Sequence, residues 1–181
     1  MKMETTRLLL RELNPEDFNA LHEILSDPQT MRHYPSPFSE EQTRRWIMRN
    51  MERYQQLGFG LWAVMLKETG KLIGDCGITM QNIHSEILPE IGYHIHRDYQ
   101  RKGYASEAAC ACMDYLFEHT QFHTAYSYMK YTNAASYGVA LKIGMRFIEE
   151  YDDLVNSRTR VYAITRDAWQ ARKIREVHSR D

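Results

Sequence analysis

One short segment of the chain combines the residue types that proton transfer and phosphate binding require. Glu90, His94 and His96 are spaced two or four apart on a strand-like run, and strand geometry places such side chains on one side. A carboxylate and two imidazoles in one row can accept protons from a substrate. The pattern fits a cleft wall and an exposed row about equally, and in an exposed row Glu90 would pair with a lysine or arginine.

The strand-like run leads into the basic stretch 100–105, and a helical run follows from Ser106. Gly103 allows close approach of backbone to a ligand. The first turn of a helix offers unpaired N–H groups and positive potential. Arg101 and Lys102 add mobile positive charge. Many strand-to-helix turns share these features without binding anything, so the loop alone favours an ordinary turn.

Composition restricts the function classes. The 181 residues suit one domain spanning residues 1–181. Lysine and arginine number 23 and aspartate and glutamate 24, so bulk charge does not predict nucleic-acid binding. The sequence contains no apolar run of membrane-spanning length and no signal-peptide pattern, so we expect no membrane partner. Three cysteines without a framework spacing favour a cytoplasmic location. His94 and His96 have no evident third ligand, so we expect no metal.

Capping signals and periodicity predict the elements. Asn14-Pro15 and Ser39 are typical helix starts. The order of strands and helices predicts a mixed α/β fold with helices on both faces of a central sheet. Strands are predicted at 6–12, 60–66, 72–80, 87–97, 125–130, 145–154 and 159–165, and helices from 14, at 39–57, 104–120 and 134–143, and from 166.

Three motifs together carry a family resemblance. The stretch 100–105 fits Gln/Arg-x-x-Gly-x-Gly/Ala, residues 133–136 read Asn-x-x-Ser ahead of 141–147, and the opening 6–17 accompanies Pro-Glu-Ile-Gly-Tyr at 89–93. The chain resembles the GCN5-related N-acetyltransferases (GNAT superfamily) over nearly its whole length, and the RimJ/RimL-like branch in particular. The resemblance implies a central, mostly antiparallel twisted sheet flanked by helices on both faces. It also implies acetyl transfer from acetyl-CoA, with CoA as product.

The resemblance further implies where acetyl-CoA binds. The loop N–H groups would hold the pyrophosphate, and the strand before the loop would bond the pantetheine arm. Asn133 resembles the family asparagine that bonds this arm, and it can also cap the following helix. The expected binding residues are His94, Ile95, His96, Arg101, Lys102, Gly103, Tyr104, Ala105, Ser106 and Asn133.

Two residues are expected to be catalytic. Glu90 is the first candidate for the general base, and Asp75 is a weaker rival. Many family members place a tyrosine seven residues after the asparagine to protonate the leaving thiolate, but Ala140 stands there. Ser136 matches the proposed substitute in RimL-like enzymes, and Tyr137 is an alternative. A protein that binds CoA without turnover is therefore a further hypothesis.

The acceptor is expected to be a primary amine. Deprotonating a lysine at pH 7 costs about 4.6 kcal/mol and an α-amine about 1.4 kcal/mol, which slightly favours a peptide N-terminus. Small-molecule amines (a polyamine, an amino acid or an antibiotic) remain the alternative, and monomer and homodimer stay open. Aromatic residues Tyr34, Trp46, Phe59 and Trp62 are candidates for the acceptor pocket, with loop 31–35 the first place to look, although Trp46 and Trp62 also suit the core.

Overall fold

The computed structural model describes residues 2–154 and 156–178. These residues form two compact units, which we call unit 1 (residues 2–79 and 92–112) and unit 2 (residues 80–91 and 113–178). Eight described strands are hydrogen-bonded in the order β1-β2-β3-β4-β5-β6-β8-β7. The registers of the paired strands are antiparallel except between β5 and β6, which run parallel.

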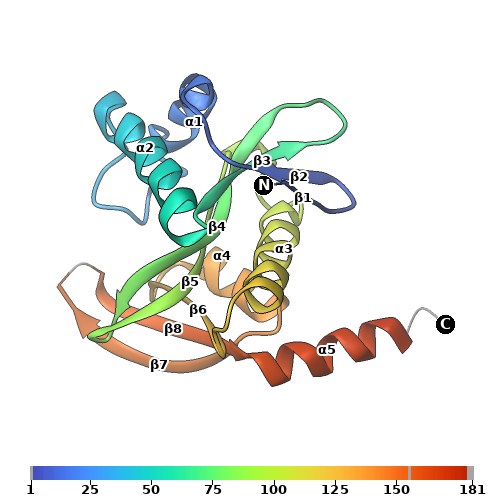
Figure 1. The fold of residues 1–181 in the computed structure, drawn as a ribbon. Coiled ribbons are helices and arrows are strands. Elements are labelled where there is room, and N and C mark those ends of the chain that lie inside the picture. Colours follow the sequence, from blue (N-terminus) through green and yellow to red (C-terminus); the bar gives the residue numbers. More distant parts are fainter. Residues whose placement is uncertain (1, 155, 179–181) are drawn as a thin grey trace. The chain divides into compact units, whose positions relative to one another are not determined.

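Unit 1 contains the N-terminal strands and two helices. The elements are β1 (Lys2–Glu4), β2 (Leu8–Arg11), a 3-10 turn (Pro15–Asp17), α1 (Phe18–Leu25), α2 (Glu40–Leu57) and β3 (Leu61–Leu66). Asn14 and Ser39 form the capping boxes that start the 3-10 turn and α2. The two helices pack side by side and share a core with the sheet (Figure 1). Met31, from the loop between them, is buried in this core.

Three elements run through both units. They are β4 (Leu72–Ile83), β5 (Glu86–Ile95) and α3 (Tyr104–His119). A second 3-10 turn (Arg97–Tyr99) follows β5 and leads into the loop before α3. The strand-loop-helix order predicted around residues 100–105 is therefore present.

Unit 2 continues with the C-terminal half of the chain. Its elements are β6 (Thr124–Lys130), α4 (Ala134–Lys142), β7 (Arg146–Asp153), β8 (Ser157–Thr165) and α5 (Arg166–His178). Strands β7 and β8 form the long hairpin that leads into α5 in Figure 1. Arg166 donates to the carbonyls of Phe117, Thr120 and Phe122, which satisfies the last turn of α3 and the residues after it.

The mixed α/β class with a mostly antiparallel sheet is confirmed, and the predicted strands and helices are present. Strand β1 was not predicted, and it pairs with β2 through Lys2–Glu4. The segment after Asn14 forms a 3-10 turn before α1 begins at Phe18. The assignment of residues 1–181 to one domain stays a prediction.

Candidate active site

The loop before α3 has an unusual backbone conformation. Arg101 and Gly103 both adopt positive φ angles, 61° and 84°. Left-handed residues alternating with others turn successive N–H groups towards one side, which creates an anion-binding concavity. A non-glycine residue rarely adopts this conformation, and Arg101 is well suited to contact an anion there. The loop geometry therefore fits the predicted pyrophosphate site.

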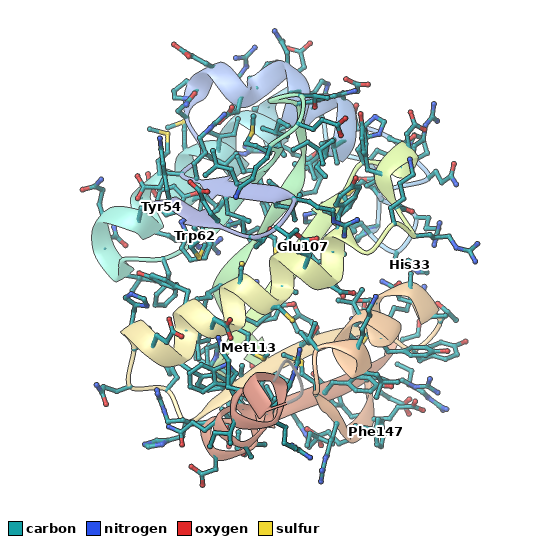
Figure 2. The ribbon with its side chains drawn as sticks, turned by 90° about the vertical axis from the view of Figure 1, so that its right-hand side faces the viewer. His33, Tyr54, Trp62, Glu107, Met113 and Phe147 are labelled. Atoms are coloured by element: carbon teal, nitrogen blue, oxygen red, sulfur yellow. The ribbon has the colours of Figure 1, made fainter. Side chains whose placement is uncertain are left out.

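Glu107 anchors this loop from the first turns of α3. Its carboxylate accepts hydrogen bonds from the Thr5 hydroxyl (2.6 Å) and from the backbone N–H and Nε of Arg7 (2.8 and 2.7 Å). Arg7 in turn donates to the Lys102 carbonyl and lies over the Tyr104 ring. Glu107 projects from α3 in Figure 2. Burial raises the pKa of Glu107, but the bonds from Thr5 and Arg7 outweigh burial and lower the pKa below its ordinary value.

Two lysines contribute positive charge beside the loop. The ammonium groups of Lys71 and Lys102 each lie 5.4 Å from the centre of the Tyr99 ring. Both lysines are exposed. Lys71 comes from the turn between β3 and β4, and sequence reasoning did not include it. Its position beside Tyr99 adds a further mobile cation to Arg101 and Lys102 at the predicted anion site.

The backbone N–H groups at the end of β5 point alternately towards β4 and away from it. The N–H groups of His94 and His96 donate to β4, to Asp75 Oδ1 (3.2 Å) and to the Ile73 carbonyl (2.8 Å). Backbone groups of successive strand residues alternate in direction, so the N–H of Ile95 points away from β4. The Ile95 carbonyl accepts a bond from Gln100 Nε2 (2.9 Å). Of these three residues, Ile95 is therefore best placed to donate its N–H to a ligand.

The side chain of His94 connects a buried carboxylate to an exposed phenol. Its Nδ1 lies 2.7 Å from Asp75 Oδ1, and its Nε2 lies 2.7 Å from Tyr34 Oη. Trp46 Nε1 donates to the other oxygen of Asp75 (2.8 Å). Asp75 is fully buried, so its carboxylate cannot touch an acceptor directly. Each of these residues could be singled out from the sequence, but their connection could not be predicted from it.

His96 has a different set of partners, one local and one distant in the sequence. Its Nδ1 accepts the N–H of Asp98 (3.2 Å), which makes His96 the cap of the second 3-10 turn. Its Nε2 lies 3.3 Å from Glu23 Oε1. His94 and His96 are both buried, so the hypothesis of an exposed row fails at this end of β5.

Glu90 belongs to the part of β5 that lies in unit 2. It is half-buried and aligned with Tyr126 of the parallel strand β6. Burial and the charge of Glu90 raise the pKa of Tyr128, so this phenol stays protonated throughout the working range of pH. A carboxylate near a neutral phenol can accept a proton. Tyr128 was not predicted from the sequence as a neighbour of Glu90.

The segment 133–140 lies at the start of α4. The Asn133 side chain accepts the N–H of Ser136 (3.2 Å), so Asn133 caps α4 as predicted. Ser136 is half-buried, and the Tyr137 ring stacks on Tyr162 with centres 6.3 Å apart. Ala140 is buried in the core of unit 2. The position at which many relatives carry a tyrosine therefore has a packing role here.

Two of the four aromatic acceptor candidates belong to the core. Phe59 and Trp62 are buried, and the Trp62 ring stacks on Tyr54 with centres 6.4 Å apart; both residues are labelled in Figure 2. Trp46 is half-buried and Tyr34 is 44% exposed. Tyr34 thus remains the strongest of the four candidates for contact with an acceptor.

The described ranges 2–154 and 156–178 lack two further features. They contain no helix that is both long and apolar enough to cross a membrane. They also contain no group of three or more histidine, cysteine, aspartate or glutamate side chains arranged to hold a metal ion.

Comparison with known proteins decides the family. The model of the acetyltransferase (GNAT) domain matches residues 7–146. The chain belongs to the GNAT acetyltransferase family. Protein YkkB of Bacillus subtilis is 38% identical over 147 residues, which cover 81% of this chain and 86% of YkkB. This GNAT chain is therefore an N-acetyltransferase by family, as the resemblance predicted.

Solved structures support the same assignment. A GNAT-family acetyltransferase from Bacillus anthracis superposes with a TM-score of 0.80 at 31% identity, covering 92% of this chain and 99% of that one. RimL, a ribosomal alpha-N-protein acetyltransferase solved with coenzyme A, has a TM-score of 0.77 at 19% identity, covering 93% of this GNAT chain and 99% of RimL. At that identity the likeness to RimL shows a shared fold.

Proposed function

We propose that this GNAT enzyme transfers the acetyl group of acetyl-CoA to a primary amine, with a protein N-terminal α-amine as the first candidate and a small-molecule amine as the second. The observation that carries the proposal is the loop 100–106. Its left-handed residues lie beside the start of α3, with Lys71 and Lys102 nearby and Glu107 as an anchor.

The residues of this loop fit the pyrophosphate of CoA. The backbone between Arg101 and Ser106 offers N–H donors, and the exposed Arg101 and Lys102 offer positive charge. The N–H of Ile95, which points away from β4, suits the thioester carbonyl, where it would stabilise developing negative charge. Asn133 is proposed to bond the pantetheine arm in addition to capping α4.

Two side chains are proposed to move protons. Glu90 accepts a proton from the nitrogen of the acceptor, directly or through water. Ser136 donates a hydrogen bond or a proton to the departing thiolate. A thiol has a pKa of about 8.5, so its thiolate is a tolerable leaving group and Ser136 is an aid rather than a requirement.

Calorimetry and a thiol-release assay test this proposal. Titration with acetyl-CoA should give a heat signal, and an acceptor panel of N-terminal peptides, polyamines and amino acids should give acetyl-CoA-dependent thiol release. Absence of binding would overturn the proposal. Binding without release on any acceptor would favour a CoA-binding protein without turnover, the alternative that Ala140 raises.

Branch membership is part of the same proposal. The motifs at 6–17 and 89–93 resemble the RimJ/RimL-like branch, and RimL itself shares the fold. An N-terminal peptide acceptor would follow from that branch. Faster thiol release with peptides than with free small amines would support it, and the reverse order would favour the second candidate.

A further inference from the structure

Three side chains of unit 1 form a hydrogen-bonded chain from the protein interior to its surface. Asp75 is fully buried, His94 is 7% exposed and Tyr34 is 44% exposed. Both links of the chain, Asp75 Oδ1 to His94 Nδ1 and His94 Nε2 to Tyr34 Oη, measure 2.7 Å. The chain therefore connects an internal carboxylate to a phenol at the protein surface.

The partners define where the protons lie. The Asp75 carboxylate accepts hydrogen bonds from Trp46 Nε1 and from the backbone N–H of His94. It therefore also accepts Nδ1–H of His94, which leaves Nε2 as an acceptor. Nε2 in turn accepts the Tyr34 O–H. A phenol oxygen can accept a hydrogen bond as well as donate one.

Neighbouring residues hold the side chains of Asp75, His94 and Tyr34 in position. The Trp46 ring lies edge-on to the His94 ring, with ring centres 5.8 Å apart. The centres of the Tyr34 and His94 rings are 5.2 Å apart. The N–H of Tyr34 donates to the Met31 carbonyl (2.8 Å), and Met31 is buried in the core. A Cβ at Gly74 would lie 2.1 Å from the His94 carbonyl oxygen, so glycine is what permits this approach of β4 to β5.

We propose that Tyr34 accepts the first proton of acceptors that arrive as alkylammonium ions, with His94 and Asp75 as positioning residues. The inference rests on the proposed acetyl transfer and deepens it. The arrangement has the logic of a nucleophile-histidine-carboxylate triad, with a phenol in the outer position. Its function is to prepare a neutral amine, because an ammonium ion has no lone pair with which to attack.

The proton transfer balances within these three residues. One N–H bond of the ammonium breaks and a new O–H bond forms at Tyr34, while the original phenol proton moves to Nε2 of His94. The products are a neutral amine, a neutral Tyr34 and an imidazolium that the Asp75 carboxylate stabilises. Release of the extra proton to water restores the starting state.

The proposal gives Tyr34 and Glu90 different protons. An alkylammonium acceptor loses one proton before attack and a second as the amide forms. Glu90, the base of the proposed function, is assigned the second, which every amine must lose. Tyr34 is needed only when the acceptor is protonated, so its importance depends on the pKa of the acceptor.

A matched pair of acceptors tests this assignment. The probes are an active alkylammonium acceptor from the panel and its analogue in which fluorine near the amine lowers the pKa of the amine below the assay pH. Thiol release is measured for the wild type, for Y34F and for Y131F. Tyr131 is a matched control because it is 41% exposed and lies outside the proposed machinery.

Y34F should lower kcat for the protonated acceptor about 100-fold or more and change kcat for the fluorinated acceptor by no more than about twofold. Its affinity for acetyl-CoA should equal that of the wild type. Y131F should match the wild type with both acceptors. Equal loss with both acceptors, or no loss with either, overturns the role of Tyr34 while acetyl transfer itself stands. Absence of thiol release by the wild type with every amine would instead refute the proposed function.

Discussion

The two ends of strand β5 carry side chains that can accept protons, and their surroundings differ. At the end in unit 1, His94 is buried between Asp75 and Tyr34 and has assigned partners on both ring nitrogens. At the end in unit 2, Glu90 is half-buried, and burial together with the charge of Glu90 raises the pKa of Tyr128. The first arrangement can pass a proton along a chain, whereas the second offers a carboxylate that accepts one directly.

This difference shows why a row of similar residue types does not predict one shared role. Strand alternation groups Glu90 with His94 because it reports only the face of the strand to which each side chain points. The partners that each side chain finds on other elements decide what chemistry it can support. The predictions below separate the two ends, beginning with the largest expected effect.

E90Q should lower kcat by about 100-fold to 10,000-fold with every amine, because the second proton leaves every acceptor. Acetyl-CoA affinity should not change. Thiol-release kinetics and calorimetry check both points. E86Q is the matched control, since Glu86 is an exposed residue of the same strand, and it should retain the wild-type rate. Comparable loss in both variants would show that charge on β5, not a base, matters.

D75N should affect both stability and the protonated acceptor. An asparagine amide must turn a donor towards Trp46 Nε1 or His94 Nδ1, which leaves a buried group unsatisfied or reverses the His94 tautomer. We expect a loss of about 1–3 kcal/mol in the free energy of unfolding and about 100-fold in kcat for protonated amines. Denaturant unfolding and the acceptor pair measure these effects.

The chain contains a matched control for that variant. Asp114 also accepts an indole N–H, from Trp169 at 2.7 Å, but it is half-exposed and paired with Lys173. D114N should cost less than about 1 kcal/mol and leave the rate unchanged. If D75N reduced kcat equally for protonated and neutral acceptors, Asp75 would have only a structural role.

E107Q should weaken acetyl-CoA binding by about 3-fold to 10-fold, because the loop loses a charge-assisted anchor to Arg7. The folded pKa of Glu107 is lowered, so its stabilising effect is complete above its ordinary pKa and is lost as the pH falls through the lower folded value. Calorimetric titration of both proteins at neutral and acidic pH checks this. E118Q, on the same helix, should bind like the wild type.

S136A should have the smallest effect, a decrease in kcat of about 2-fold to 5-fold, because the thiolate leaves without strong assistance. Y137F is the comparator, and it should have the wild-type rate because the Tyr137 ring packs on Tyr162. A larger loss in Y137F than in S136A would transfer the role of Ser136 to Tyr137.

Much of the fold was predictable because its elements carry local signals. The capping boxes at Asn14 and Ser39 and the alternation along the strands depend on neighbouring residues only. The loop before α3 was located by Gly103 and the basic residues around it. Strand β1 was missed because three residues are too few to show a period, and its pairing with β2 is a tertiary interaction.

The link between Asp75 and His94 could not be predicted without the register of β4 and β5. Two residues of positive φ, His84 and Ser85, form the turn between these strands. Asp75 lies nine residues before His84 and His94 nine residues after Ser85, which makes them cross-strand partners. A His-Ser pair lacks the Asn-Gly or Asp-Gly signature of such turns, so the sequence did not reveal the register.

The conformation of this turn depends on long-range contacts within unit 2. The His84 ring stacks on Tyr151 with centres 4.7 Å apart, and its Nδ1 lies 3.0 Å from Glu149 Oε2. Tyr34 was similarly unpredictable as a partner of His94, because its place depends on the packing of Met31 in the core.

The most direct test of the account compares Y34F and E90Q in one measurement, the ratio of kcat for the protonated acceptor to kcat for its fluorinated analogue. The account predicts that Y34F lowers this ratio about 100-fold relative to the wild type, whereas E90Q slows both acceptors and leaves the ratio unchanged. An unchanged ratio in Y34F, or the same fall in both variants, would contradict the assignment of different protons to the two ends of β5.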